Sequence, residues 1–241
     1  MRAKISYYLF TCNIHRSNRI RQLTTMCSNK RGALIVVEGV DRSGKSTQCK
    51  KLVEALEQAN FPAKLMTFPD RTTLTGKLID DYLKNKDCKL NDQAIHLLFS
   101  ANRWENVEKM KSLINCGVTL VIDRYSYSGI AFSAVKKVMN LDWCKQPENG
   151  LPKPDLVFLL TISLEEMLTR PGFGNERYEN MSFQNNVANM YNSLCSDKDN
   201  WVKINAAGSI EEVHKKLVDI SLNTIREVES LPLKSLYFEK S

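Results

Sequence analysis

The chain has 241 residues, of which 25% are charged, and a formal net charge of +7; this length suits one large α/β domain and is short for two. All of the excess positive charge lies in the first 31 residues, and the remaining 210 residues carry 27 basic and 27 acidic side chains. This balance argues against a nucleic-acid partner. Because no apolar run reaches membrane-spanning length, we expect no membrane partner either.

The first 30 residues are rich in arginine, contain no acidic residue and include several serines and threonines. This composition is typical of a mitochondrial transit peptide, although a second start at Met26 would give a chain that begins close to the first predicted strand. In either case we expect residues 1–30 to be a disordered extension and residues 31–241 to form the folded domain. The expected location is the cytoplasm or the nucleus, with mitochondria as the alternative for the long form.

Short apolar runs alternate with amphipathic stretches through the rest of the chain. The run at 34–37 is β-branched and bounded by glycine, which predicts a strand buried on both faces. Strands are predicted at 34–37, 63–67, 118–122, 155–161 and 202–204, and helices at 45–59, 74–83, 91–114, from about 126, as an interrupted pair within 164–194, and at 210–228. This order predicts an α/β three-layer sandwich, in which a five-stranded parallel sheet has helices on both faces.

The segment 39–47 reads GVDRSGKST, which fits GxxxxGK[ST] and lies between a predicted buried strand and a predicted helix. Its glycines allow backbone amides to turn toward phosphate oxygens, while Lys45 reaches the transferred phosphates and the Ser46 hydroxyl can bind Mg²⁺. The motif predicts a fold of the P-loop NTPase type. The residues expected to bind ATP here are Gly39, Arg42, Ser43, Gly44, Lys45, Ser46 and Thr47.

Asp123 ends the third predicted strand and Arg124 follows it directly. Because ligands bind at the carboxyl ends of strands in open α/β sheets, we expect Asp123 to help hold magnesium, with a simple turn cap as the alternative. Phosphoryl transfer gathers negative charge, which calls for several positive side chains. Arginines stand near the ends of several predicted elements: Arg42, Arg71, Arg103, Arg124, Arg170 and Arg177. We expect Lys45, Arg42, Asp123 and Arg124 to be catalytic.

Residues 170–180, RPGFGNERYEN, combine helix-breaking glycine and proline with flanking charge. This pattern is typical of a mobile lid over phosphates, and a plain surface loop is the alternative. We expect a helical lid over about residues 168–184. Phe99 and Tyr178 are candidate aromatic surfaces for a nucleotide base, although aromatic residues at helical spacing are also common in protein cores.

The seven cysteines are scattered, odd in number and never in a CxxC pair, which predicts neither a disulfide framework nor a zinc site. The three histidines, His15, His96 and His214, are not spaced with cysteine or acidic residues as metal ligands would be. We interpret them as packing or surface residues. Reduced thiols fit the cytosol or the mitochondrial matrix.

Several long motifs together resemble the thymidylate kinases of the eukaryotic cytosolic type. They are GVDRSGKST, FPDR, HLLFSANRWE, VTLVIDRYSYSG, LDWCKQPENGLPKPDL and FGNERYEN, in the order and spacing of that family, over about residues 32–228. The resemblance implies transfer of the γ-phosphate of ATP to dTMP, giving dTDP and ADP for dTTP synthesis, with Mg²⁺ as cofactor. It also implies a homodimer that associates through its helices.

The resemblance further implies a role for individual residues. Asp41 would contact the 3′-hydroxyl of the sugar, Arg71 and Arg124 would hold the acceptor phosphate, and Arg42 would be the catalytic arginine of the P-loop. The FPDR motif also places Phe68 among the substrate-binding residues. The remaining implied contacts are Phe99 stacked on thymine, Arg103 at the edge of the base, Tyr178 and Gln184 along the sugar and base, Arg170 and Arg177 at the donor phosphates, and Ala207 in the loop 206–209 near the donor adenine. Pro171 departs from the family pattern, because glycine is expected there, and this puts the lid kinetics in doubt.

Two alternatives remain open from the sequence. One is a related P-loop kinase that acts on a nucleoside or on another nucleotide such as dUMP. The other is a nucleotide-binding regulator without kinase activity. The chain has no NKxD-type guanine-binding motif, and Phe99 with Arg103 would form a second base site that a regulator does not require.

Overall fold

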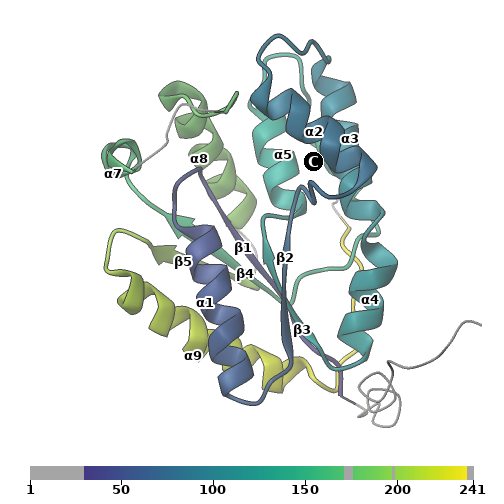
Figure 1. Cartoon of the computed structure of the whole chain (residues 1–241), viewed down its shortest axis with the longest axis vertical. Coiled ribbons are helices and arrows are strands. Elements are labelled where there is room, and N and C mark those ends of the chain that lie inside the picture. The colour runs from purple at the N-terminus through teal and green to yellow at the C-terminus, as the bar shows by residue number, and fades with distance from the viewer. Residues whose placement is uncertain (1–29, 171–175, 197–198, 238–241) are drawn as a thin grey trace, which may run out of the picture.

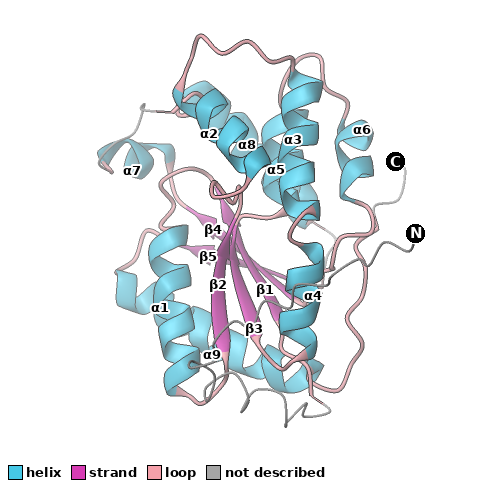
Figure 2. Cartoon of the chain, turned by 45° about the vertical axis from the view of Figure 1, so that its right-hand side comes forward, coloured by secondary structure: helices cyan, strands magenta, loops and turns pink. Residues whose placement is uncertain are grey.

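The computed structural model describes residues 30–170, 176–196 and 199–237, and its centre is one sheet of parallel strands (Figures 1 and 2). The strands are β1 (Leu34–Gly39), β2 (Ala63–Thr67), β3 (Thr119–Asp123), β4 (Leu156–Thr161) and β5 (Trp201–Asn205). Their order is β2-β3-β1-β4-β5, so β1 lies in the middle. All five predicted strands are present, and their ends differ from the prediction by at most two residues.

Helices cover both faces of the sheet. They are α1 (Lys45–Gln58), α2 (Leu74–Lys84), α3 (Asp92–Trp104), α4 (Val107–Asn115), α5 (Ser126–Ala134), α6 (Leu141–Lys145), α7 (Leu164–Thr169), α8 (Met181–Cys195) and α9 (Ile210–Val228), with a short 3-10 turn η1 (Gln146–Glu148). α1 and α9 pack on the face to which Ile35 and Val37 belong. α4, α5 and α8 pack on the face of Leu34 and Val36. Because side chains alternate along a strand, the continuous apolar run of β1 serves both cores, and the predicted three-layer sandwich is confirmed.

α2 and α3 pack together beyond the carboxyl ends of the strands, at the top of Figure 2. The prediction of one helix over 91–114 was wrong, because α3 and α4 are separate helices. At the break, the Asn106 amide side chain donates to the carbonyl of Asn102 (3.1 Å), and the Asn106 backbone N–H bonds to Arg103 (3.1 Å). Such local side-chain bonds compete with regular helix bonding, and the bend directs α4 back onto the sheet.

The sequence prediction also missed α6 and η1, which lie between α5 and β4. The buried Ser100 hydroxyl donates to the carbonyl of Pro147 (3.0 Å), and the Trp104 indole donates to the same oxygen (2.7 Å). These two bonds from α3 hold η1 against it. The turn therefore joins the wall formed by α3 and α5.

Past α9, residues 230–237 return along the segment that follows η1. The Gly150 N–H donates to the Leu236 carbonyl (2.7 Å), and the Leu236 N–H donates to the Leu151 carbonyl (2.7 Å). The Leu236 side chain is buried in the larger core. The described end of the chain is thus hydrogen-bonded next to η1.

The predicted extension falls outside the described residues except for Lys30, which is exposed. Arg31 forms two hydrogen bonds to the Asp155 carboxylate (2.8 and 2.7 Å), just before β4. Of the predicted lid, residues 171–175, including Pro171, also lie outside the described residues. Within residues 30–170, 176–196 and 199–237, no helix is long and apolar enough to cross a membrane.

Candidate active site

A cavity of about 730 Å³ opens at the carboxyl ends of the central strands. The P-loop, the start of α1, the segment after β2, α3, α5 and residues 176–179 contribute to its wall. The predicted site residues that line it are Asp41, Arg42, Gly44, Lys45, Ser46, Thr47, Phe68, Arg71, Phe99, Arg103, Asp123, Arg124, Arg170 and Tyr178. Those that do not line it are Gly39, Ser43, Arg177, Gln184 and Ala207.

The P-loop holds its lysine against the loop backbone. Lys45 Nζ donates to the Val40 carbonyl (2.7 Å) and to Ser43 Oγ (3.3 Å). Burial, and then the nearby Arg124 guanidinium, lower the pKa of Lys45 to about 8. Gly39 has a φ of 146°, and a Cβ there would lie 2.5 Å from the Leu160 carbonyl oxygen. The loop therefore requires glycine at this position, where it passes close to β4.

Two oxygen ligands suitable for magnesium lie next to the P-loop. Ser46 Oγ donates to Asp123 Oδ2 (2.5 Å), whereas Asp123 Oδ1 is buried and has no hydrogen-bond partner among the described residues. A carboxylate oxygen beside a hydroxyl is the donor set that Mg²⁺ prefers, because this ion takes most of its remaining ligands from phosphates and water. The described residues contain no group of three or more His, Cys, Asp or Glu that could hold a metal ion. These two residues therefore fit the ion.

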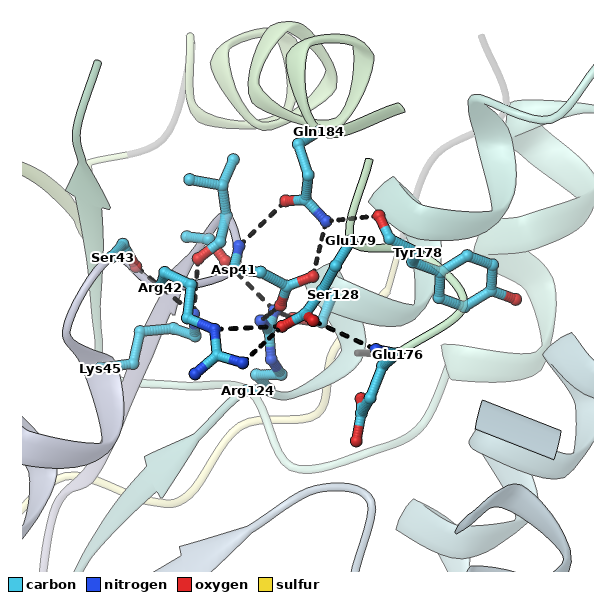
Figure 3. Close-up of polar contacts among 12 residues, drawn as sticks. Asp41, Arg42, Ser43, Lys45, Arg124, Ser128, Glu176, Tyr178, Glu179 and Gln184 are labelled. Carbon is cyan, nitrogen blue, oxygen red and sulfur yellow. Dashed lines mark hydrogen bonds and ion pairs between the residues drawn. The ribbon is translucent and has the colours of Figure 1, made fainter. Parts of the chain in front are cut away.

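Arg124 and Gln184 fix the position of Asp41 (Figure 3). Arg124 Nη2 donates to Asp41 Oδ1, and its Nη1 donates to the Gly39 carbonyl (3.1 Å). Burial is the largest single effect on the pKa of Arg124 and lowers it, but Asp41 together with the other nearby groups Tyr191, Asp123 and Glu38 raises that pKa above its ordinary value. Gln184 is fully buried, so it contacts Asp41 from behind the cavity wall.

Glu38 is a functional candidate that sequence reasoning missed. Its carboxylate is fully buried and accepts hydrogen bonds from the backbone of Tyr125 (2.9 Å) and Ser128 (3.1 Å), and from the side chains of Ser128 (2.5 Å) and Tyr191 (3.0 Å). These bonds fix the first turn of α5, directly after Arg124. A charged residue at the end of the apolar run LIVVE was the available signal, since a buried carboxylate requires partners.

Arg103 is held by a second residue that sequence reasoning missed. Its Nε donates to Glu148 Oε2 (2.7 Å), and its Nη2 pairs with Glu148 Oε1. Both side chains are almost completely buried. On the other side Gly129 leaves room for the guanidinium, because a Cβ there would lie 2.5 Å from Nη2. Glu148 could not be paired with Arg103 from spacing, because 45 residues separate them.

Aromatic side chains surround this end of the cavity. Phe132 and Tyr178 meet edge to face with their ring centroids 5.9 Å apart, and Phe99 completes the lining. An apolar aromatic compartment with one fixed guanidinium is suited to a nucleobase. The cavity thus has a basic end, at the P-loop, and an aromatic end, between α3 and α5.

Acidic residues of the segment before α8 contact several arginines of the site. Glu176 pairs with Arg71 (2.9 Å), which also pairs with Asp80. Glu179 bonds to Arg42 (3.1 Å from Nε and 3.0 Å from Nη2). The segment thereby bridges the two sides of the cavity.

Two predicted ATP contacts lie elsewhere. Arg177 donates to the carbonyls of Tyr82 (3.0 Å), Asn85 (2.7 Å) and Cys88 (2.9 Å), and its guanidinium lies 4.1 Å from the centroid of the Tyr82 ring. It therefore fastens its segment to the end of α2 and faces away from the P-loop. Ala207 is exposed after β5, where its N–H bonds to Asn205 (2.9 Å).

Arg170, which was predicted to contact the donor phosphates, lies beside the P-loop. Its Nη1 donates to the carbonyl of Arg42 in the P-loop (2.6 Å), and its Nη2 donates to the Ala206 carbonyl (3.1 Å). The side chain therefore links the P-loop to the loop after β5.

Comparisons with known proteins agree on one family. A family model described as thymidylate kinase matches residues 37–217. The thymidylate kinase of Danio rerio is 50% identical over 211 residues, covering 87% of this chain and 99% of the relative, and that of Homo sapiens is 50% identical over 209 residues, covering 86% and 98%. The solved structure of thymidylate kinase from Candida albicans has a TM-score of 0.80 and 39% identity, covering 86% of this chain and 99% of that one.

Proposed function

The chain belongs to the thymidylate kinase family and is an ATP:dTMP phosphotransferase, and from this premise we propose how its own residues bind the substrates and catalyse transfer. The observation that supports the proposal is the two-ended cavity, which has the P-loop at one end and an aromatic compartment at the other. ATP enters with its phosphates at the basic end. dTMP enters with its base at the aromatic end, so that its phosphate points back toward the P-loop.

The donor phosphates are bound by the P-loop amides and by Lys45, with Arg42 and Arg170 beside them. Lys45 is pre-positioned by its bonds to Val40 and Ser43, which phosphate oxygens replace on binding. Ser46 and Asp123 would hold Mg²⁺, which would supply positive charge to neutralise the phosphates. The unpartnered Asp123 Oδ1 supports this assignment.

The acceptor is bound by residues from five segments of the chain. The carboxylate of Asp41 accepts from the 3′-hydroxyl of the sugar, while Arg71 and Arg124 hold the acceptor phosphate. Phe68, Phe99 and Tyr178 supply the apolar walls for the base, and Arg103 donates to its edge. All of these residues line the cavity. We assign Gln184 to positioning Asp41, because it is buried behind the wall.

Transfer needs positioning and charge neutralisation more than proton transfer. The attacking oxygen of the dTMP phosphate is already ionised at neutral pH, so a strong general base is unnecessary. No described histidine lines the cavity, whereas lysine and arginine side chains converge on its basic end. Arg42 and Arg124 stabilise the charge that develops on the transferred group.

We also propose a lid over about residues 168–184. Its described part carries Glu176 and Glu179, which contact Arg71 and Arg42. Nucleotide phosphates compete for the same arginines, so binding releases these contacts and allows the segment to settle on the substrates. Arg177 stays bonded to the end of α2 and serves as the anchor of the segment.

A homodimer and a cytoplasmic location complete the proposal. α2 exposes Leu74 and Leu78, with 81% and 58% of their surface accessible, and the neighbouring α3 exposes Leu97. We infer that these leucines of two packed helices form one apolar patch, which is suited to association with a second copy. Cys49 and Cys144 are buried thiols, as expected in a reducing compartment. A fluorescent fusion of residues 1–31 tests the mitochondrial alternative for the long form.

The direct test is ADP release from Mg-ATP with dTMP, dUMP, UMP, CMP, AMP and thymidine as acceptors. The proposed site predicts strong preference for dTMP. Equal use of CMP or AMP would contradict the roles of Arg103 and the aromatic compartment. Phosphorylation of thymidine in place of dTMP would contradict the roles of Arg71 and Arg124.

A further inference from the structure

His96 lies in α3, directly behind the aromatic end of the cavity. Its ring is fully buried, with Nδ1 2.8 Å from Ser133 Oγ and Nε2 3.0 Å from the carbonyl oxygen of Cys144. The ring also contacts the Trp143 side chain, with 5.5 Å between the ring centroids. Because buried polar atoms need hydrogen-bond partners, these two contacts fix the orientation of the ring.

The two partners determine where the ring hydrogen lies. A backbone carbonyl can only accept a hydrogen bond, so Nε2 carries the hydrogen and donates to Cys144. Burial is the largest effect on the pKa of His96 and lowers it; Glu148 and the backbone carbonyls of Cys144 and Gly129 oppose this effect, and Arg103 adds to it. The ring is therefore neutral at physiological pH, and Nδ1 offers a lone pair. The hydroxyl of Ser133 is the donor to that lone pair.

This arrangement makes the Ser133 hydroxyl, in the cavity wall, a hydrogen-bond acceptor toward the cavity. Ser133 lines the cavity one helical turn after Gly129, the residue against which the Arg103 guanidinium packs. Because the Ser133 hydrogen is engaged by His96, its oxygen presents only lone pairs to a ligand. Glu148 engages Nε and Nη2 of Arg103, which leaves Nη1 as the donor for a ligand. A fixed donor and a fixed acceptor thus line the same cavity.

Resting on the proposed function, we propose that His96 is a specificity-positioning residue, which holds the Ser133 hydroxyl as an acceptor so that it and Arg103 together read thymine. Thymine presents an acceptor at O4 beside a donor at N3–H, which matches Arg103 and Ser133. Cytosine presents a donor amino group at C4 beside an acceptor N3. Its amino group would therefore face the donor Arg103, and its N3 would face the acceptor Ser133. His96 contacts no nucleotide and acts only through Ser133.

The test compares dTMP with 5-methyl-dCMP, because these acceptors share the sugar, the phosphate and the 5-methyl group. The measured quantity is the ratio of their kcat/KM values. His96→Phe keeps a ring in the core but frees the Ser133 hydroxyl to rotate and donate to N3 of the cytosine ring. We expect the preference for dTMP to fall about tenfold, which is the value of one hydrogen bond. His96→Gln offers an acceptor and a donor in similar positions and should restore the ratio.

A double-mutant cycle separates positioning from packing. In a Ser133→Ala background, His96→Phe should leave the ratio unchanged, because the hydroxyl that it controls is gone. An unchanged ratio in the single His96→Phe variant, or an equal change in both backgrounds, would overturn the proposal. ATP affinity and thermal unfolding report whether each variant is folded. If His96→Phe does not fold, a native ratio in Ser133→Ala alone would still overturn the proposal.

Failure of this inference is distinguishable from failure of the proposed function. Native protein that does not phosphorylate dTMP contradicts the proposed function. Native protein that prefers dTMP, with variants that retain the preference, contradicts only the role of His96.

Discussion

Gln184 binds Asp41 at two points: its Nε2 donates to the Asp41 carboxylate (2.5 Å), and its Oε1 accepts from the Asp41 backbone N–H (2.9 Å). A third bond runs from Nε2 to the Tyr178 carbonyl (3.0 Å). One buried amide therefore connects the P-loop to the wall of the acceptor site. This side chain joins the first turn of α8 to the P-loop, as Figure 3 shows.

We expect Gln184→Glu to weaken dTMP binding. The new carboxylate cannot donate to Asp41 and repels it, so the KM for dTMP should rise by about tenfold or more. Steady-state kinetics with each substrate varied in turn measure this effect. Gln58→Glu, an exposed change at the end of α1, is the matched control. An unaltered KM in Gln184→Glu would remove Gln184 from the site.

Arg42→Ala should abolish most of the turnover. Loss of a single arginine that stabilises the transition state of phosphoryl transfer costs on the order of a thousandfold in kcat. The measurement is single-turnover transfer from ATP to dTMP. Arg226→Ala, which removes an exposed arginine from α9, should retain native kcat. Equal rates in native protein and Arg42→Ala would refute the catalytic role.

ATP binding should become weaker as the pH rises through about 8. The pKa of Lys45 is lowered to about 8 by burial, so the free protein carries this charge below that pH and loses it above. The negative phosphates favour the protonated lysine, so binding above pH 8 takes up a proton. Calorimetry in buffers of different ionisation enthalpy measures the uptake at pH 9. Lys45→Arg should abolish it, and a constant affinity from pH 7 to 9.5 would contradict the assignment.

The Arg103–Glu148 pair should contribute both to stability and to the preference for dTMP, and two variants can separate these contributions. Glu148→Ala leaves a buried guanidinium unpaired, which costs about 3–5 kcal/mol and lowers Tm by roughly 10 °C. The double variant Arg103→Met with Glu148→Leu removes both charges and should recover most of the Tm. Its preference for dTMP should still be lost, because no donor remains for the base edge. A double variant that keeps the native preference would exclude Arg103 from base recognition.

The exposed leucines of α2 should mediate dimer formation. Replacing Leu74 and Leu78 by glutamate places charge within the apolar patch, so sedimentation should show a monomer. Val138→Glu, at a position with 68% of its surface exposed outside these helices, should leave the assembly unchanged. A monomeric native protein would contradict the proposed dimer.

The sequence predicted what depends on local pattern. The P-loop follows from contiguous residues, and Asp123 follows from its place at the end of an apolar run. Long-range pairings could not be predicted: Gln184 lies 143 residues from Asp41 and was expected along the nucleotide, but packs behind the cavity wall. Arg177 was assigned to the donor phosphates from the family resemblance, whereas its guanidinium donates to three backbone carbonyls.

Secondary structure was predictable to a similar extent. The apolar stripe through 91–114 is continuous in sequence, so periodicity alone could not show that Asn106 ends the helical path. The same bend places Arg103 at the last turn of α3, within reach of Glu148. His96 was interpreted as a packing residue because its partners, Ser133 and Cys144, are distant in the chain.

The bonds of Leu236 to Gly150 and Leu151 have a practical consequence for handling the protein. These bonds brace the turn that carries Glu148, so a deletion or a bulky fusion that disturbs the last described residues would reach the base-recognition compartment through two backbone contacts. Expression vectors should therefore avoid a purification tag at the C-terminus, which would adjoin this brace. If a screening assay used a C-terminally trimmed enzyme, the measured affinities of thymine analogues would reflect an altered base-recognition compartment.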